Sequence, residues 1–201
     1  MSDLRFHVLP SARELKTECI RKSIHFLIAL SPTMAAVSKP LTVAILAAGT
    51  LLYACFETLR LLGVKVPLVS SLTSIASRSR DRGHFVLGPV TLGLGALLAL
   101  LLYPSPAASI AIYALAFGDG FASLIGKFFG VHRPSIMLGK SIEGSMACFI
   151  AVFMAAIKVS GSIQITLAAA ITATLVEVLP LEDYDNLALP IAVGFAVQAF
   201  L

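Results

Sequence analysis

Apolar segments long enough to cross a lipid bilayer follow one another along most of this chain. A membrane-spanning helix needs about 20 mostly apolar residues. Because lipid cannot form hydrogen bonds with the backbone, the backbone groups must pair within the helix. The composition agrees, because 58% of the 201 residues are hydrophobic, 13% are charged and the mean hydropathy is +0.93. We therefore predict an all-α, polytopic membrane protein of about seven transmembrane helices. The expected spans are residues 23–38, 41–62, 85–103, 106–129, 144–159, 163–180 and 187–201.

The segments before and between these spans predict a single domain over residues 1–201. Residues 1–22 are polar and lack the short apolar core and cleavage site of a signal peptide. Helix-breaking residues separate neighbouring spans. They are Pro40, Pro104 and Gly161. Three glycines in the third span favour close helix packing over a nucleotide-binding loop. They are Gly88, Gly93 and Gly95.

Basic residues are distributed unevenly over the two sides of the predicted bundle. With seven spans, 13 of the 15 Lys and Arg residues precede the first span or lie around the second and fourth connections. Lys39 and Lys158 lie on the other side. Because positively charged segments tend to stay in the cytoplasm, we predict a cytoplasmic N-terminus.

One carboxylate, Asp119, lies between two glycines in the middle of an apolar run. A charge there costs roughly 2.5–3.5 kcal/mol on insertion scales, and such residues usually serve function. Glu57 and Glu177 also lie within or at the ends of apolar segments. These carboxylates predict a polar site near the cytoplasmic face. We expect Asp119→Asn to fold well, because it removes a costly charge, and to be nearly inactive.

Acidic and basic residues alternate within the polar clusters, as in sites that bind a polyphosphate through a divalent metal. Carboxylates hold Mg²⁺ through oxygen atoms, while Lys and Arg neutralise phosphate oxygens. The GKS sequence at 139–141 is not a P-loop, because Pro134 replaces the glycine required five positions before Gly139.

Several of these residues also have plainer interpretations, which the sequence leaves open. Arg21 and Lys22 could be topological anchors. Glu57 and Arg60, three positions apart, could form only an interfacial ion pair. Glu177 could be a helix-end carboxylate that reaches water or is hydrogen-bonded.

Short motifs in a fixed order connect nearly the whole chain with a known family. They are RKSIH at 21–25, Glu57 with Arg60, GDGFASLIGKFFG at 118–130, KSIEGS at 140–145, Glu177, and DNLALP at 185–190. The chain resembles the polyprenol kinase family of membrane enzymes, which includes dolichol kinase, phytol kinase and CTP-dependent diacylglycerol kinase. The GDGFASLIG stretch at 118–126 and the KSIEGS motif at 140–145 are also similar to the membrane cytidylyltransferases that make CDP-diacylglycerol. One departure is the stretch SRSRDRGHF, where Asp81 is a displaced counterpart of the family's carboxylate and is left out of the site.

The resemblance implies transfer of the γ-phosphate of CTP to the hydroxyl of a long-chain lipid alcohol, such as polyprenol, phytol or diacylglycerol. The reaction would occur at the cytoplasmic membrane face with Mg²⁺ or another divalent metal. The expected partners are the lipid bilayer, the lipid alcohol and CTP, without nucleic acid. Which carboxylate takes the hydroxyl proton stays open.

The resemblance also implies roles for individual residues. The implied catalytic residues are Asp119, Lys140 and Glu143. The implied nucleotide and phosphate contacts are Arg21, Lys22, Gly118, Gly126, Lys140, Ser141 and Gly144. The implied metal ligands are Asp119, Glu143 and Asp185. The supporting polar residues are His25, Glu57, Arg60, Glu177 and Asn186.

Two alternative functions remain. A phosphatidate cytidylyltransferase would use the same CTP but attack its α-phosphorus and release pyrophosphate. A small membrane transporter would also place charges within helices, but it favours paired broken helices in two related halves. The charges cluster at one leaflet and no internal repeat is evident, which disfavours transport.

Overall fold

The structure is a computed structural model that describes residues 12–64 and 83–201. Within these ranges the chain consists of helices and connecting segments, with no strand, so the prediction of an all-α fold is confirmed there. The first part of the polar segment 1–22 lies outside the described residues. So do Asp81 and the basic residues around it, which are Arg78, Arg80 and Arg82.

The described residues form a series of α-helices and single helical turns. The α-helices are α1 (Ala12–Leu27), α2 (Ser31–Leu61), α4 (Gly88–Leu102), α5 (Ala107–Tyr113), α6 (Asp119–Phe128), α7 (Ile142–Ser160), α8 (Ile163–Val178) and α9 (Asp185–Gln198). Single turns of 3₁₀ helix are η1 (Ile28–Leu30), η4 (Ser135–Met137) and η5 (Glu182–Tyr184), and η3 (Ala114–Gly118) is π-helical.

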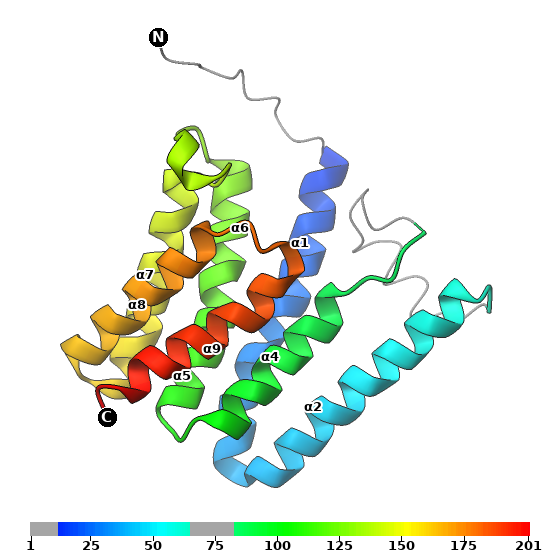
Figure 1. Ribbon diagram of the computed structural model, residues 1–201, viewed down its shortest axis with the longest axis horizontal. Helices are drawn as coiled ribbons and strands as arrows, with labels where there is room; N and C mark the ends of the chain where they lie inside the picture. The colour runs from blue at the N-terminus through cyan, green and yellow to red at the C-terminus, as the bar shows by residue number, and fades with distance from the viewer. Residues whose placement is uncertain (1–11, 65–82) are drawn as a thin grey trace.

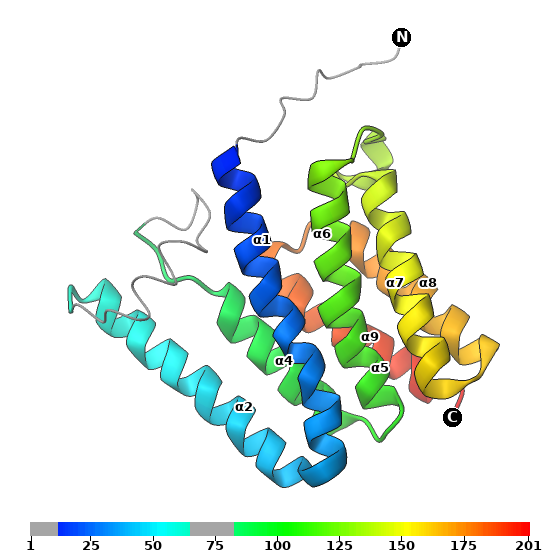
Figure 2. The same cartoon turned by 180° about the vertical axis from the view of Figure 1, so that it is seen from behind.

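The chain reverses direction between α1 and the long arm of α2, which returns beside α4 (Figures 1 and 2). Ser38 interrupts α2 with extended backbone angles, φ −155° and ψ 100°. Its hydroxyl accepts a hydrogen bond from the Leu41 N–H at 3.4 Å, as a helix N-cap does. Pro40 follows near the start of the new arm, where its missing N–H costs little. This break separates the first two expected spans at the predicted position.

Among the described residues, three helical segments are long and apolar enough to cross a membrane. They are Glu14–Leu61, Ala107–Phe128 and Ile142–Ser160. The first contains both of the first two expected spans, whereas Gly88–Leu102 and Ile163–Val178 are apolar but shorter. Helices thus occupy the expected positions, but the count of seven crossings and the cytoplasmic N-terminus stay predictions.

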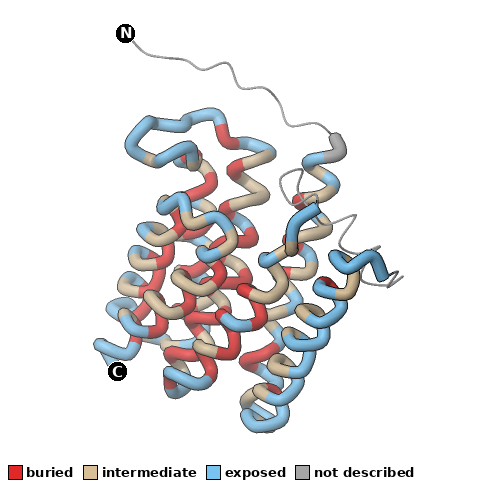
Figure 3. The backbone as a smooth tube through the Cα atoms, turned by 45° about the vertical axis from the view of Figure 1, so that its right-hand side comes forward, coloured by how far each residue is buried: buried red, intermediate tan, exposed pale blue. Residues whose placement is uncertain are grey.

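The core is built around the segment that joins α5 to α6. Ile110, Ile112 and Leu115 are at most 1% exposed, and α7 and α9 pack against α5. Buried backbone gathers in this part of the molecule, while much of α2 is exposed (Figure 3). The outer surface is also apolar, since Leu51 is 70% exposed and Phe195 72%. Such a surface suits surrounding lipid better than water.

Glycines bring the helix backbones close together, as small residues do in membrane proteins. A Cβ atom on Gly93 would lie 2.1 Å from the Thr50 hydroxyl oxygen. A Cβ atom on Gly95 would lie 2.0 Å from the carbonyl oxygen of Asn186. The predicted packing role is therefore confirmed for both glycines, and α4 lies directly against α9 at Gly95.

This contact predicts opposite effects for two Gly→Ala substitutions. Gly95→Ala should lower the free energy of unfolding by about 1–3 kcal/mol, because the new methyl group overlaps backbone. Gly49→Ala in α2 is the matched control, since a Cβ there meets nothing within 4 Å. It should be neutral or stabilising by up to about 1 kcal/mol. Thermal unfolding in detergent measures both, and equal melting temperatures would contradict the α4–α9 contact.

Candidate functional site

Asp119 begins α6 directly after the π-helical turn η3. The Asp119 N–H donates to the Ala114 carbonyl, in place of the Leu115 carbonyl that an α-helix would use. The Leu115 carbonyl oxygen instead lies 2.9 Å from Nε2 of His25 on α1. Single π-helical turns within longer helices are frequent at functional sites. This turn therefore links the backbone before Asp119 to α1.

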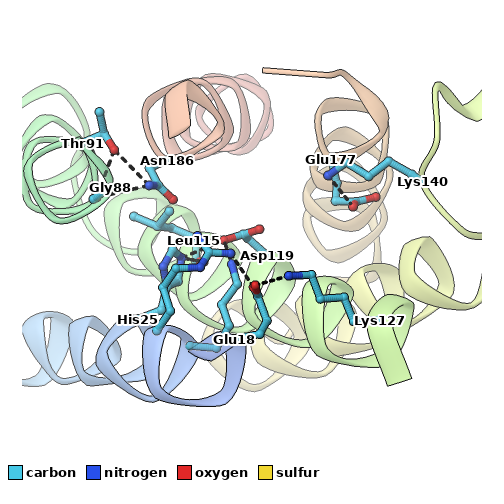
Figure 4. Close-up of polar contacts among 12 residues, drawn as sticks. Glu18, His25, Gly88, Thr91, Leu115, Asp119, Lys127, Lys140, Glu177 and Asn186 are labelled. Carbon is cyan, nitrogen blue, oxygen red and sulfur yellow. Dashed lines mark hydrogen bonds and ion pairs between the residues drawn. The ribbon is translucent and has the colours of Figure 1, made fainter. Parts of the chain in front are cut away.

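Two side chains of α1 hold the Asp119 carboxylate (Figure 4). Lys22 Nζ donates to Asp119 Oδ2, and His25 Nε2 lies 3.0 Å from the same oxygen. All three side chains are at most 6% exposed. Gly120 allows α1 to come this close, because a Cβ there would lie 2.4 Å from the Phe26 ring. The structure thus brings together predicted residues that are 97 positions apart.

A second ion cluster lies one turn earlier on α1, and it includes two residues that the sequence analysis missed. The Glu18 carboxylate accepts from Arg21 through Oε1 and from Lys127 of α6 through Oε2. Its side chain is 1% exposed. Glu18 precedes Lys22 by four positions and so shares a helix face with it, which is the signal that could have found it. Nothing in the spacing of Lys127 identifies its partner.

Asp185, at the start of α9, lies within electrostatic reach of Asp119. Burial and the negative charge of Asp119 raise the pKa of Asp185 from its ordinary 3.8 to about 7. Nearby cations oppose this shift. They are Lys22, Lys140 and Arg21. Predicted residues from α1, α6, α9 and the segment before α7 therefore converge on one region.

Asn186, the next residue, joins α9 to α4. Its Nδ2 donates to Thr91 Oγ1 at 2.9 Å and approaches the Gly88 carbonyl oxygen at 3.4 Å. The residue is 2% exposed. Its Oδ1 atom is buried and has no hydrogen-bond partner within the described part of the chain. Asn186 thus supports the position of α9 beside the predicted site.

Lys140 and Glu177 form an ion pair between the segment before α7 and the end of α8 (Figure 4). Lys140 Nζ lies 2.9 Å from Glu177 Oε1, and the Ser145 hydroxyl donates to Oε2 at 3.0 Å. The Glu177 side chain is 5% exposed. Glu177 is therefore a buried, hydrogen-bonded carboxylate at the end of a helix, as one of its plainer interpretations expected, and it does not reach water.

The predicted nucleotide-binding glycines lie against protein atoms. Ser141 caps α7, because its hydroxyl oxygen accepts from the Gly144 N–H at 3.1 Å. A Cβ on Gly126 would lie 3.1 Å from that same oxygen, and one on Gly118 would lie 2.8 Å from Val152. These close contacts explain why residues without a side chain are needed at Gly118 and Gly126 for the helices to pack. Their proposed role in nucleotide binding stays a prediction.

Glu143 is paired with the loop before α7. Its Oε1 accepts from the His132 backbone N–H at 3.1 Å and lies 2.7 Å from His132 Nδ1. Its Oε2 is buried and has no partner among the residues that the structure describes. The two predicted catalytic carboxylates therefore have different partners. Glu143 binds His132, whereas Asp119 binds Lys22.

Glu57 and Arg60 form a bidentate ion pair near the end of α2. The two guanidinium-to-carboxylate distances are 2.8 and 2.7 Å. Glu57 also accepts from the Val86 N–H at 3.0 Å, and Arg60 donates to the His84 carbonyl at 3.0 Å. These contacts tie α2 to the segment before α4. They match the plainer interpretation as an ion pair better than membership of the Asp119 cluster.

The donor groups do not fit a metal held by the protein alone. Within residues 12–64 and 83–201, no three His, Cys, Asp or Glu side chains lie together in a way that could hold a metal ion. Of the predicted ligands, Asp119 is occupied by Lys22, and Glu143 by His132. The predicted ligands Asp119, Glu143 and Asp185 therefore do not form such a group among the described residues.

The arrangement can hold fixed charges in a buried place. Arg21, Lys22 and Lys127 bring positive charge to the contact of α1 with α6, where Glu18 and Asp119 bind them. Fixed charges of this kind stabilise the charge that moves during phosphoryl transfer. The fold and the site together define an all-helical protein with membrane-type apolar helices and a buried ionic cluster.

Comparison with known proteins supports a relationship to the polyprenol and phytol kinase family. The chain is 29% identical over 140 residues to a protein named probable phytol kinase, chloroplastic, from Triticum aestivum. It is 29% identical over 154 residues to probable phytol kinase 1, chloroplastic, from Glycine max. The matches cover 61% and 67% of this chain, but only 47% and 51% of those relatives. The chain therefore spans about half the length of the curated relatives it matches.

No family model and no solved structure matches the chain. The resemblances to dolichol kinase, diacylglycerol kinase and the cytidylyltransferases stay predictions.

The Lys22–Asp119 pair corrects the expectation that Asp119→Asn folds well. Removing one partner of a buried ion pair leaves the other charge uncompensated and costs about 3–5 kcal/mol. We expect such a loss for Asp119→Asn and for Lys22→Met. The loss in free energy of unfolding of the double variant should be much smaller than the sum of the two single losses. A double-mutant cycle on unfolding in detergent measures this, and additive losses would show that the two side chains do not interact.

The raised pKa of Asp185 predicts a pH-dependent contribution to stability. Between pH 3.8 and about 7 the folded protein holds a proton on Asp185 that the unfolded chain releases. The free energy of unfolding of the wild type should therefore fall across this window relative to Asp185→Asn. Above pH 7 the difference should level off. Unfolding measurements on both proteins from pH 4 to 8 test this, and a constant difference would contradict the raised pKa of Asp185.

Proposed function

We propose that the protein is a CTP-dependent kinase that transfers the γ-phosphate of CTP to the hydroxyl of a long-chain lipid alcohol. The observation that carries the proposal is the convergence of Arg21, Lys22, Asp119 and Asp185 near one buried place, as the resemblance implied. The two phytol kinase relatives support a lipid alcohol as the acceptor. CTP as the donor rests on the motif resemblance.

The chain's cations would bind and orient the phosphates. Phosphoryl transfer depends mainly on positioning and on neutralising the charge of the phosphate oxygens. Arg21 offers a planar fork of donors that matches phosphate oxygens, and Lys140 is a point charge held by Glu177. Asp119 fixes the ammonium group of Lys22 and the ring of His25. An exchange of partners at Asp119 would then accompany substrate binding.

A divalent metal enters this proposal only as part of the nucleotide substrate. Mg²⁺ is normally bound through few protein groups together with substrate phosphates. The CTP–Mg²⁺ complex would bring its own ion to the carboxylates. The chain's part is then to accept that complex beside Asp119 and Asp185.

The exposed apolar helices favour a lipid acceptor within the membrane. Large side chains such as Leu101 and Leu175 cover the outer surface at 61% and 66% exposure. A long-chain alcohol in the bilayer would lie along such helices, with its hydroxyl near the polar cluster. The cytoplasmic orientation of the site stays part of the proposal.

The product distinguishes this function from its nearest alternative. Purified protein with CTP and polyprenol, phytol or diacylglycerol should form CDP and a lipid phosphate. With γ-labelled CTP the label should move to the lipid, and with α-labelled CTP it should stay on CDP. Pyrophosphate and a CDP-lipid would instead establish a cytidylyltransferase. Equal turnover with ATP at the same concentration would overturn the choice of donor.

A lysine substitution tests the site within the same assay. Lys140→Gln should lower kcat/KM by about 10²-fold, in line with loss of one group that stabilises transition-state charge. Its side chain is 33% exposed, and the glutamine amide can still donate to Glu177, so the loss of stability should be smaller than for Lys22→Met. Lys158→Gln, near the end of α7, and Glu182→Gln, in the loop before α9, should remain close to wild type. Near-normal turnover of Lys140→Gln would remove Lys140 from the proposed site.

A further inference from the structure

The Glu18 carboxylate joins two cations that belong to different helices. Arg21 lies one turn after it on α1, and Lys127 lies in the last turn of α6. Each cation takes one of the two carboxylate oxygens. Burying a carboxylate is costly unless its charge is compensated, and here two positive charges meet one negative charge. The group therefore carries a net positive charge.

The cations are more accessible than the carboxylate that holds them. The Lys127 side chain is 37% exposed and that of Arg21 20%, whereas Glu18 is 1% exposed. An anion approaching from outside would meet Arg21 and Lys127 first.

Arg21 also has an unused donor. Its Nε atom is buried and makes no hydrogen bond to the residues that the structure describes. An unsatisfied buried donor costs about 1–3 kcal/mol, so an additional acceptor oxygen there would be favourable. A guanidinium group binds phosphate through parallel hydrogen bonds. The spare donor therefore points to an oxyanion as the ligand.

The group adjoins the site proposed above. Arg21 interacts electrostatically with Asp119 and Asp185 as well as with Glu18. A phosphate bound by Arg21 and Lys127 would thus belong to a chain of phosphates that continues toward Lys22. Glu18, which binds Lys127, precedes Lys22, which binds Asp119, by four residues, about 6 Å along the axis of α1.

We propose that Arg21 and Lys127 bind one end of a polyphosphate, and that Glu18 is the internal carboxylate with which this phosphate competes. The proposal rests on the proposed function for the identity of the polyphosphate. It adds Lys127 as a phosphate-binding residue and Glu18 as a residue that positions both cations. In binding, the two cations exchange one shared carboxylate for phosphate oxygens.

Inorganic tripolyphosphate is the probe that tests this without any phosphoryl transfer. Its dissociation constant is measured by titration calorimetry on the purified full chain in detergent, at constant ionic strength. Lys127→Gln should weaken binding about tenfold, as expected for one charged hydrogen bond. Glu18→Gln should strengthen it about fivefold, because an exposed cation pair no longer has an internal competitor. The Glu18→Gln gain should disappear when Lys127→Gln is also present.

Lys158→Gln is the control for loss of one positive charge and should change the dissociation constant less than twofold, since a distant exposed charge is screened. Unchanged binding by Lys127→Gln would overturn the site. Unchanged or weaker binding by a folded Glu18→Gln would overturn the competition and leave Glu18 as a structural bridge. If Glu18→Gln does not fold, the site is tested by comparing the tripolyphosphate dissociation constants of Lys127→Gln and Lys158→Gln.

The two proposals can fail separately. Tripolyphosphate binding with the expected pattern but without lipid phosphorylation would retain this site and reject the kinase. Lipid phosphorylation without the expected pattern would retain the kinase and reject the role of Glu18 and Lys127.

Discussion

The buried ion pair between Lys22 and Asp119 is the interaction on which the placement of α1 depends. It joins the first described helix to α6 in the middle of the chain, and His25 and the π-helical turn before Asp119 reinforce it. Gly120 makes the approach possible, because any side chain there would meet Phe26. Without the pair, α1 would present a lysine and a histidine to an apolar interior.

Stability alone does not explain these charges. An ion pair within a protein is often no more stable than two apolar residues of similar size, because both charges lose their hydration. This structure nonetheless buries Glu18, Lys22 and Asp119 at the contact of α1 with α6. We propose that these charges are retained because they interact with a charged ligand.

The sequence predicted the helices and much of the cluster, for different physical reasons. Apolar runs and breakers such as Pro40 located the helices, since lipid-facing segments and helix ends depend on local composition. The cost of a charge in an apolar run identified Asp119. What could not be predicted was pairing between distant helices. Lys127 has no local feature that assigns it to Glu18, and the buried partner of Asp119 was missed in the expectation for Asp119→Asn.

The partners of Glu143 and Glu57 could not be predicted from the sequence either. Both are carboxylates in motifs that resemble the family, yet Glu143 binds His132 and Glu57 binds Arg60 with the backbone of Val86. A motif gives the residue type and its order in the chain. The partner depends on how helices far apart in sequence pack, and that packing also decides whether carboxylates gather into a metal site.

We propose that Lys22 and Asp119 form a functional site and not only a structural link. The most direct test is the charge-swapped protein that carries both Lys22→Asp and Asp119→Lys, measured for unfolding temperature and for phosphoryl transfer from CTP to a lipid alcohol. The swap keeps an ion pair but reverses its direction. We expect a melting temperature closer to wild type than that of either single variant, together with loss of phosphoryl transfer. A swapped protein that is stable and fully active would contradict this proposal.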